Sequence, residues 1–225
     1  MRRYPVATPF RHGSCRRSFT TPREGASMSE AGHARFGPGP LPASAESAPS
    51  ARVAISLRSD RGFLNLRLNP RDGQAVEAAE RILGQSMPQA ANTFTNDGHE
   101  VYWLGPDEWL IATVAERTAA LGSELAEALS GFHAAVNDVS GGFVELLVRG
   151  ADARTVLAKG CTLDLHPREF APGQCAQTGL GRAAVLLAAG DPSTCTIVVR
   201  RSFSDYVRRW LENAARPHRA RISAL

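Results

Sequence analysis

Residues 53–57 and 63–68, VAISL and FLNLRL, place apolar side chains at alternate positions and flank the turn-like cluster SDRG at 59–62. Alternation with a period of two is typical of half-buried β-strands, and two such runs around a short turn predict a hairpin. GQAVEAAERILG at 73–84 follows, with apolar residues at helical spacing and a glycine at its end. This stretch therefore predicts two strands followed by a helix.

The order of strands and helices continues to residue 131. HEVYWLG at 99–105 and EWLIATV at 108–114 predict two strands that flank the turn Gly105-Pro106-Asp107. AERTAALGSELAEALSG at 115–131 predicts a second helix that ends at a glycine. The first part of the chain therefore reads strand, strand, helix, strand, strand, helix.

The second part follows a similar scheme without obvious sequence identity to the first. FHAAVNDVS at 132–140 and GFVELLVRG at 142–150 predict strands across the turn Ser140-Gly141-Gly142, and ADARTVLAKG at 151–160 predicts a short helix. Three more strands are expected in QCAQTGL, RAAVLLAAG and TCTIVVRR. Strands in pairs between single helices indicate antiparallel or mixed sheets, so the sequence predicts an α+β fold.

An amphipathic helix is expected to close the folded region. SFSDYVRRWLENAA at 202–215 begins at Ser202, a residue type that is favoured at helix N-caps. Its apolar face is expected to hold Phe203, Tyr206, Val207, Trp210 and Leu211.

The ends of the chain differ from the middle in composition. Residues 1–50 are rich in Arg, Pro, Ser and Ala and lack apolar periodicity, so we expect a disordered extension. Met28 is an alternative start within it, and an over-extended reading frame is favoured over an arginine-rich targeting signal. The expected units are a folded region at 51–215, its halves at about 51–131 and 132–215, and a basic tail at 216–225.

Composition and charge disfavour several classes of protein. The chain has 225 residues, of which 43% are hydrophobic, enough to bury a core. No apolar run approaches the roughly 20 residues that span a bilayer, and no secretory signal is recognisable, so a cytoplasmic protein without a membrane partner is expected. The formal charge of +4 comes from arginines near both ends, whereas the middle has more acids than bases. That distribution disfavours nucleic-acid binding.

Cysteine and histidine spacing supports neither a disulfide framework nor a metal site. Cys15, Cys161, Cys175 and Cys195 form no C-x-x-C pair, and the six histidines are isolated from one another and from the cysteines. Reduced and mostly buried thiols are therefore expected.

Two glycine-containing motifs match catalytic signatures only in part. The segment 179–184, GLGRAA, fits the G-x-G-x-x-A pattern of dinucleotide loops, but no acidic residue follows about twenty positions later. A glycine hairpin is the favoured interpretation. The segment 138–142, DVSGG, resembles a nucleophile elbow, yet Asp138 stands where that elbow needs glycine. A turn in which Asp138 or Ser140 bonds nearby backbone is the simpler interpretation.

The remaining polar residues form no complete catalytic constellation. Asp107 and Glu108 are adjacent, and consecutive strand residues point to opposite faces, so the two carboxylates cannot act on one substrate atom. Arg200 and Arg201, at a strand end, are suited to pairing with a carboxylate, a phosphate or an acidic residue of another subunit. No catalytic, cofactor-binding or metal-binding residue is therefore expected in this chain.

Large aromatic side chains lie near the edges of the predicted elements. Most are expected in the core, but aromatic residues with arginines nearby are also preferred anchors of protein interfaces. The residues expected to act in an interface or to support the fold are Trp103, Asp107, Glu108, Trp109, Asp138, Ser140, Arg200, Arg201, Phe203 and Trp210.

Four longer segments carry a resemblance to a known family. They are LGPDEWLI at 104–111, NDVSGGFVELLVRG at 137–150, LAKGCTLDLHPREFAPGQCAQTGL at 157–180 and VRRSFSDYVRRWLENA at 199–214. In this order they resemble the sarcosine oxidase gamma subunit family, and the resemblance covers about residues 52–215. It implies two ferredoxin-like halves, similar to the folate-binding aminomethyltransferase of the glycine cleavage system.

The resemblance also implies a non-catalytic subunit of a heterotetrameric sarcosine oxidase. In such complexes a beta subunit oxidises the N-methyl group of sarcosine at a flavin, and oxygen reoxidises that flavin to give hydrogen peroxide. The one-carbon unit passes to tetrahydrofolate on an alpha subunit, which is also expected to bind NAD, and a delta subunit carries zinc. FAD, FMN, NAD, tetrahydrofolate and zinc are accordingly expected in the alpha, beta and delta partners, and none of them in this chain.

Two other classes of function stay open. An independent folate-dependent aminomethyltransferase would need a pocket carboxylate for the pterin ring, for which Asp138 and Glu145 are the candidates. A regulatory RNA-binding module is suggested by the arginines at both ends of the chain.

Overall fold

The computed structural model of the protein describes residues 52–224. The expected disordered extension, with Cys15 and Met28, lies outside these residues. The described strands and helices are β1 Val53–Arg58, β2 Arg61–Leu68, α1 Gly73–Leu83, β3 Phe94–Asn96, β4 Glu100–Gly105, β5 Glu108–Val114, α2 Ala115–Ala128, β6 Ala134–Asp138, β7 Phe143–Arg149, α3 Ala153–Ala158, β8 Cys175–Leu180, β9 Ala183–Asp191, β10 Thr194–Arg200, α4 Ser204–Ala215 and β11 Ala220–Ala224. Short 3₁₀ helices lie at Ser140–Gly142, Arg201–Phe203 and Arg216–His218.

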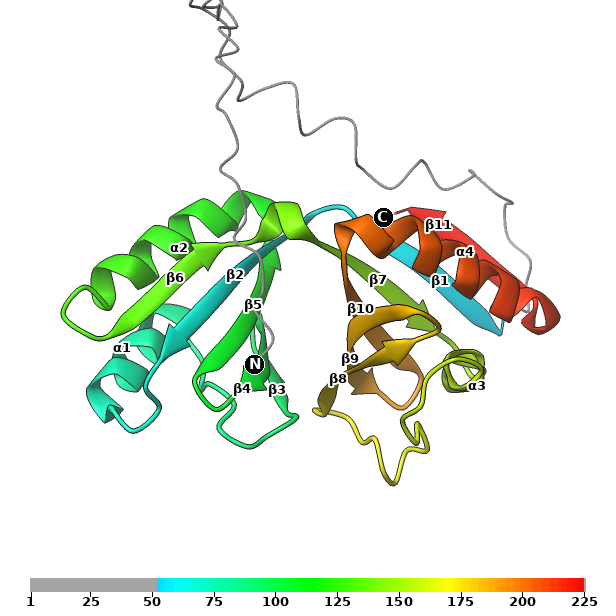
Figure 1. The fold of residues 1–225 in the computed structure, drawn as a ribbon, viewed down its shortest axis with the longest axis horizontal. Coiled ribbons are helices and arrows are strands. Elements are labelled where there is room, and N and C mark those ends of the chain that lie inside the picture. The colour runs from blue at the N-terminus through cyan, green and yellow to red at the C-terminus, as the bar shows by residue number, and fades with distance from the viewer. Residues whose placement is uncertain (1–51, 225) are drawn as a thin grey trace, which may run out of the picture. The chain divides into compact units, whose positions relative to one another are not determined.

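The strands form two sheets, each covered by helices on its outer face (Figure 1). The β2 sheet has the strand order β3-β4-β5-β2-β6 and is covered by α1 and α2. The β7 sheet has the order β11-β1-β7-β10-β9-β8 and is covered by α3 and α4. The expected α+β class, with paired antiparallel strands between single helices, is confirmed.

Each sheet contains a ferredoxin-like arrangement. In the β2 sheet, the succession β2-α1-β4-β5-α2-β6 gives the strand order β4-β5-β2-β6, and β3 adds one strand at the edge. In the β7 sheet, β7, β9 and β10 with α3 and α4 repeat this plan, and β1 occupies the place of the fourth strand, antiparallel to β7. The expected halves, 51–131 and 132–215, thus exchange one strand each, because β1 and β6 lie in the sheet of the other half.

The hairpin expected around 59–62 is wrong, and the two strands expected across 140–142 form but do not pair with each other. β1 pairs with β7 and β11, whereas β2 pairs with β5 and β6. The short links after β1 and after β6 are therefore crossings between the sheets (Figure 1). A polar turn-like cluster predicts that the chain changes direction, but it carries no information on which strand becomes the neighbour.

Three apolar clusters hold the layers together. One lies between the β7 sheet and its helices, and a second lies between the β2 sheet and its helices. The third joins the inner faces of the two sheets, with Phe63, Tyr102 and Leu110 from the β2 sheet against Leu186 and Val198 from the β7 sheet. The inner faces are therefore apolar where they meet.

One predicted helix end agrees with the structure, whereas one predicted helix start and the C-terminal strand differ from the expectation. α1 ends at Gly84, which has a φ of 69°, so the predicted glycine cap is confirmed. The predicted cap Ser202 is wrong, because 201–203 form a 3₁₀ turn and no side chain caps α4; Ser204 Oγ instead donates to Arg201 O at 2.7 Å. β11 was not expected: it lies within the predicted basic tail and pairs in parallel with β1.

No helix within the described residues is long and apolar enough to cross a bilayer.

Candidate functional site

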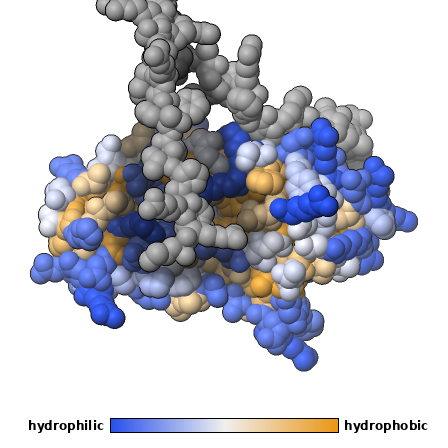
Figure 2. Space-filling model, in the orientation of Figure 1, coloured by the Kyte–Doolittle hydropathy of each residue, from blue (hydrophilic) through white to orange (hydrophobic). Residues whose placement is uncertain are grey.

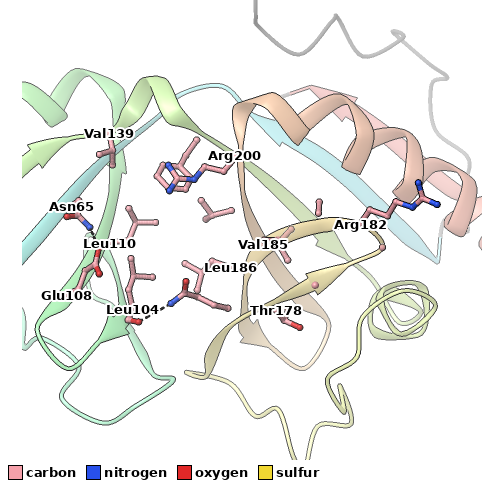
Figure 3. A pocket seen from close by; sticks show the side chains of 17 residues that line it. Asn65, Leu104, Glu108, Leu110, Val139, Thr178, Arg182, Val185, Leu186 and Arg200 are labelled. Atoms are coloured by element: carbon pink, nitrogen blue, oxygen red, sulfur yellow. Dashed lines mark hydrogen bonds between the residues drawn. The ribbon is translucent and has the colours of Figure 1, made fainter. Parts of the chain in front are cut away.

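A groove of about 810 Å³ opens between the inner faces of the two sheets. Figure 2 shows both apolar and hydrophilic surface in the middle of this face of the molecule, and mainly hydrophilic residues at its margins. Side chains from β2, β4 and β5 line one wall, and residues of β8, β9 and β10 line the other (Figure 3). Most of the lining side chains are apolar, which is the usual character of binding sites of this size.

Glu108 stands at the β2-sheet wall of the groove. Its Oε1 accepts from Asn65 Nδ2 at 2.8 Å (Figure 3). Its Oε2 accepts from Arg67 Nη2 at 2.8 Å. Partial burial raises the pKa of this carboxyl, but the hydrogen bonds from Asn65 and Arg67 outweigh that effect and leave the pKa below its usual value. Asp107 instead lines a separate cavity beside His133. The two adjacent carboxylates thus line different hollows, but Asp107 lies in the turn before β5 and not on a strand.

Asp138, Ser140 and Arg201 meet at the crossing from β6 to β7. Ser140 Oγ accepts from Phe63 N at 2.9 Å and donates to Asp138 Oδ1 at 2.6 Å. Arg201 Nε donates to Gly141 O at 2.8 Å. These three predicted residues therefore fix the backbone of the crossing, and the interpretation of 138–142 as a hydrogen-bonded turn is confirmed.

Arg200 lies beside this crossing and contributes a positive charge to the groove. Its guanidinium lies 4.4 Å from the centre of the Phe143 ring, in the geometry of a cation–π contact. Figure 3 shows Arg200 toward the end of the groove where Val139 lies, and Phe143 also lines the groove.

A buried charge cluster that the sequence interpretation missed links the two sheets. Glu145 on β7 is fully buried and accepts from Arg58 Nη1 and from Arg61 Nε, each at 3.1 Å. Arg61 also pairs with Glu100 on β4. The available signal was a single acidic residue within the apolar run FVELLV, because a charge on a buried strand face needs partners.

The predicted aromatic residues lie in different surroundings. Trp109 is fully buried and its indole N–H donates to Pro88 O at 2.8 Å. Trp103 packs on the cluster between the β2 sheet and its helices, and Trp210 packs on that of the β7 sheet. Phe203 remains exposed at the start of α4.

The two carboxylates that were candidates for a pterin ring do not fit that role. Glu145 is committed to Arg58 and Arg61, and one oxygen of Asp138 is held by Ser140. Neither residue lines the groove, and Glu108, which does, has both oxygens paired. The described residues therefore offer no free carboxylate for folate in this groove.

The described thiols are free. Cys175 and Cys195 are buried, and Cys161 is half-buried. Burial raises the thiol pKa of Cys175 to about 12 and that of Cys195 to about 11, so both stay protonated at neutral pH. The expectation of reduced, mostly buried thiols is confirmed for these three residues. Within 52–224, no group of three or more His, Cys, Asp or Glu side chains is placed to hold a metal ion.

The segment 179–184 forms the turn between β8 and β9, where Gly181 has a φ of 59°. A helix does not follow it, so the glycine hairpin is confirmed and the dinucleotide loop is excluded.

Comparison with known proteins gives consistent matches. Residues 68–217 match the model of the "Sarcosine oxidase, gamma subunit family". The chain is 35% identical over 164 residues to sarcosine oxidase subunit gamma of Corynebacterium sp. (strain U-96). The aligned residues make up 72% of this chain and 79% of that relative. The chain is 32% identical over 168 residues to sarcosine oxidase subunit gamma of Arthrobacter sp. The aligned residues make up 73% of this chain and 82% of that relative.

Two solved structures share the fold. A chain of the heterotetrameric sarcosine oxidase from Corynebacterium sp. U-96, in complex with pyrrole 2-carboxylate, superposes with a TM-score of 0.70 and 32% identity over 76% of this chain and 88% of that chain. Aminomethyltransferase T of the glycine cleavage system from Bartonella henselae superposes with a TM-score of 0.55 and 15% identity over 77% of this chain and 48% of that chain. The second match shows a common fold only.

Proposed function

The chain belongs to the sarcosine oxidase gamma subunit family, and we propose that it supports an oxidase complex without carrying out the chemistry itself. The observation that carries the proposal is the match to one chain of a heterotetrameric sarcosine oxidase, 88% of which this chain covers. The proposed partners are the alpha, beta and delta subunits, in the cytoplasm.

The proposed reaction of the complex is the oxidative demethylation of sarcosine to glycine. Oxygen is reduced to hydrogen peroxide and the one-carbon unit passes to tetrahydrofolate. We assign FAD, FMN, NAD, tetrahydrofolate and zinc to the partner subunits. Support comes from the way this chain uses its polar groups: Glu108, Asp138 and Glu145 are all engaged in hydrogen bonds that hold its own strands and turns.

The alternative of an independent folate-dependent aminomethyltransferase receives no support from the groove, since its one lining carboxylate is paired on both oxygens. The RNA-binding alternative rested largely on arginines within the first 27 residues, which lie outside the described part of the chain.

Co-expression with the three candidate partners tests the proposal. We expect this chain to co-elute with them in size exclusion, in fractions that show a flavin spectrum and oxidise sarcosine with release of hydrogen peroxide. The matched control omits this chain, and we expect a lower yield of assembled, active complex. Sarcosine turnover by the lone chain, or full assembly and activity without it, would contradict the proposal.

A further inference from the structure

β8 is an edge strand of the β7 sheet, and its outer edge is closed only at its two ends. At one end Cys175 N donates to Asn92 O at 2.8 Å, and at the other Gly181 N donates to Gly160 O at 2.9 Å. Backbone groups alternate in direction along a strand, so Gln177 and Gly179 also present their N–H and C=O groups to this edge. The bridge between Cys161 and Leu180 brings Thr162 N against Gly179 O, so among the described residues Gln177 N–H, Gln177 C=O and Gly179 N–H are the outward groups left without a partner. These three backbone groups therefore leave an opening in the middle of the outer edge of β8.

This opening borders the groove between the sheets. Gln177 and Gly179 both line the groove, and a Cβ built on Gly179 would meet nothing within 4 Å. The Gln177 side chain crosses the groove and donates from Nε2 to Leu104 O on β4 at 2.9 Å (Figure 3). The face of β8 at Gly179 is therefore open toward the groove.

The groove also has a defined chemical character. Leu110, Leu186 and Val198 present apolar surface from the facing sheets. Arg200 supplies an exposed positive charge, and the only carboxylate among the described lining residues, Glu108, is neutralised by its own partners. An occupant with an apolar side chain and a negative charge would complement these walls.

We infer that the groove receives an extended, acidic segment of another subunit of the oxidase complex. The segment pairs as an added strand with Gln177 and Gly179, places an apolar side chain between the sheets and sets a carboxylate against Arg200. Main-chain pairing requires free backbone groups on an edge strand, and β8 provides the N–H and C=O of Gln177 and the N–H of Gly179 beside an apolar groove. The inference rests on the proposed function.

Hydrogen–deuterium exchange tests the pairing directly. We expect the amides of Gln177 and Gly179 to exchange at least about tenfold more slowly in the assembled complex than in the lone full-length chain. The amides of Ala176 and Thr178 already belong to the β8–β9 ladder and provide internal references. In a second experiment, the exchange of the same two amides is measured after tetrahydrofolate has been added to the lone chain.

Paired substitutions separate backbone pairing from charge recognition. Gly179→Pro removes the outward N–H on an edge strand, where proline is tolerated, and Gly179→Ala is its control because it keeps the N–H. We expect Gly179→Pro to weaken assembly roughly 2- to 10-fold relative to Gly179→Ala. Arg200→Gln should weaken assembly roughly tenfold, and Arg200→Lys should weaken it less because it keeps the charge.

The outcomes distinguish this inference from the function on which it rests. If the complex assembles but both amides exchange as fast as in the lone chain, or if Gly179→Pro and Arg200→Gln assemble like the native chain, the inference is wrong and the proposed function stands. If tetrahydrofolate alone slows the exchange, the occupant is a small molecule and the inference is wrong. If the native chain joins no complex, both fail. If Gly179→Pro does not fold, the assembly of the Arg200→Gln variant still tests the inference.

Discussion

Arg61 on β2 and Glu145 on β7 form an ion pair that ties the two sheets together, with Nε and Oε2 3.1 Å apart. The side chain of Arg61 is 5% exposed and that of Glu145 is 0% exposed. Arg58 and Glu100 complete the cluster, so each of the two buried charges has more than one partner. Removing one member of such a cluster leaves a buried charge without full compensation.

Glu145→Gln is expected to lower the free energy of unfolding by about 3 kcal/mol, because Arg58 and Arg61 lose their shared carboxylate. Urea unfolding at neutral pH measures the change. Glu124→Gln is the matched control, since Glu124 pairs with Arg117 on the surface and its loss should cost at most about 0.5 kcal/mol. Equal effects of the two substitutions would contradict the structural role of the cluster.

Gly150→Ala is expected to destabilise the protein by at least about 2 kcal/mol. Gly150 has a φ of 117°, and a Cβ there would lie 2.2 Å from the backbone oxygen of Arg52, which cannot move aside as a side chain could. Gly131→Ala is the control, because a Cβ at Gly131 meets nothing within 4 Å. Thermal unfolding of the two variants should give clearly different midpoints.

His99 is expected to make stability fall as the pH falls. Burial lowers the pKa of His99 below its ordinary value of 6.5, and the charges of Arg117 and Arg61 add to that effect. As the pH drops through 6.5 the unfolded chain binds a proton before the folded chain does, so this contribution is present above that pH and is lost below it.

His99→Gln removes that titration and is expected to flatten the loss of stability between about pH 7.5 and about pH 5.5. Unfolding free energies of both proteins across this range measure the difference. His99 Nδ1 lies 3.0 Å from Thr113 Oγ1, so the substitution should also change stability at high pH by a constant amount. A wild-type curve that runs parallel to the variant curve would exclude His99 as the source.

Ser140→Ala is expected to cost about 1 to 2 kcal/mol, because Phe63 N loses its acceptor at the crossing between the sheets. Asp138→Ala should cost less, since it acts on Phe63 only through Ser140. In a double-mutant cycle the two effects should fall short of additivity by about 0.5 kcal/mol or more. Additive effects would show that the two side chains stabilise the crossing independently.

Individual strands and helices could be predicted from the sequence because the residue patterns that define them extend over only a few neighbouring positions. The alternation in FLNLRL and the helical spacing before Gly84 each depend on a few neighbouring residues, and β2 and α1 formed as expected. The short β3, Phe94–Asn96, and β11, in ARISA, were missed because such short runs hold too few residues for a periodic pattern.

Strand partners and the charge cluster could not be predicted in the same way. Arg61 and Glu145 are 84 positions apart, and only the crossing of the chain between the sheets brings them together. The hairpin expected around 59–62 failed for the same reason, and the strands on either side of 140–142 lie in different sheets. The candidate residues Asp138 and Ser140 were found because their hydrogen bonds lie within two positions of each other.

The place of β1 between β7 and β11 has a consequence for the order of events on the ribosome. β1 is synthesised before every other described strand, but its neighbours β7 and β11 emerge only after the whole β2 sheet has been made. Val53 and Ile55 are fully buried in the finished molecule, so they lack their final neighbours during that interval. Until β7 has emerged, β1 lacks both of the strands that flank it in the finished sheet, and we expect this apolar segment to be a binding site for chaperones during that interval.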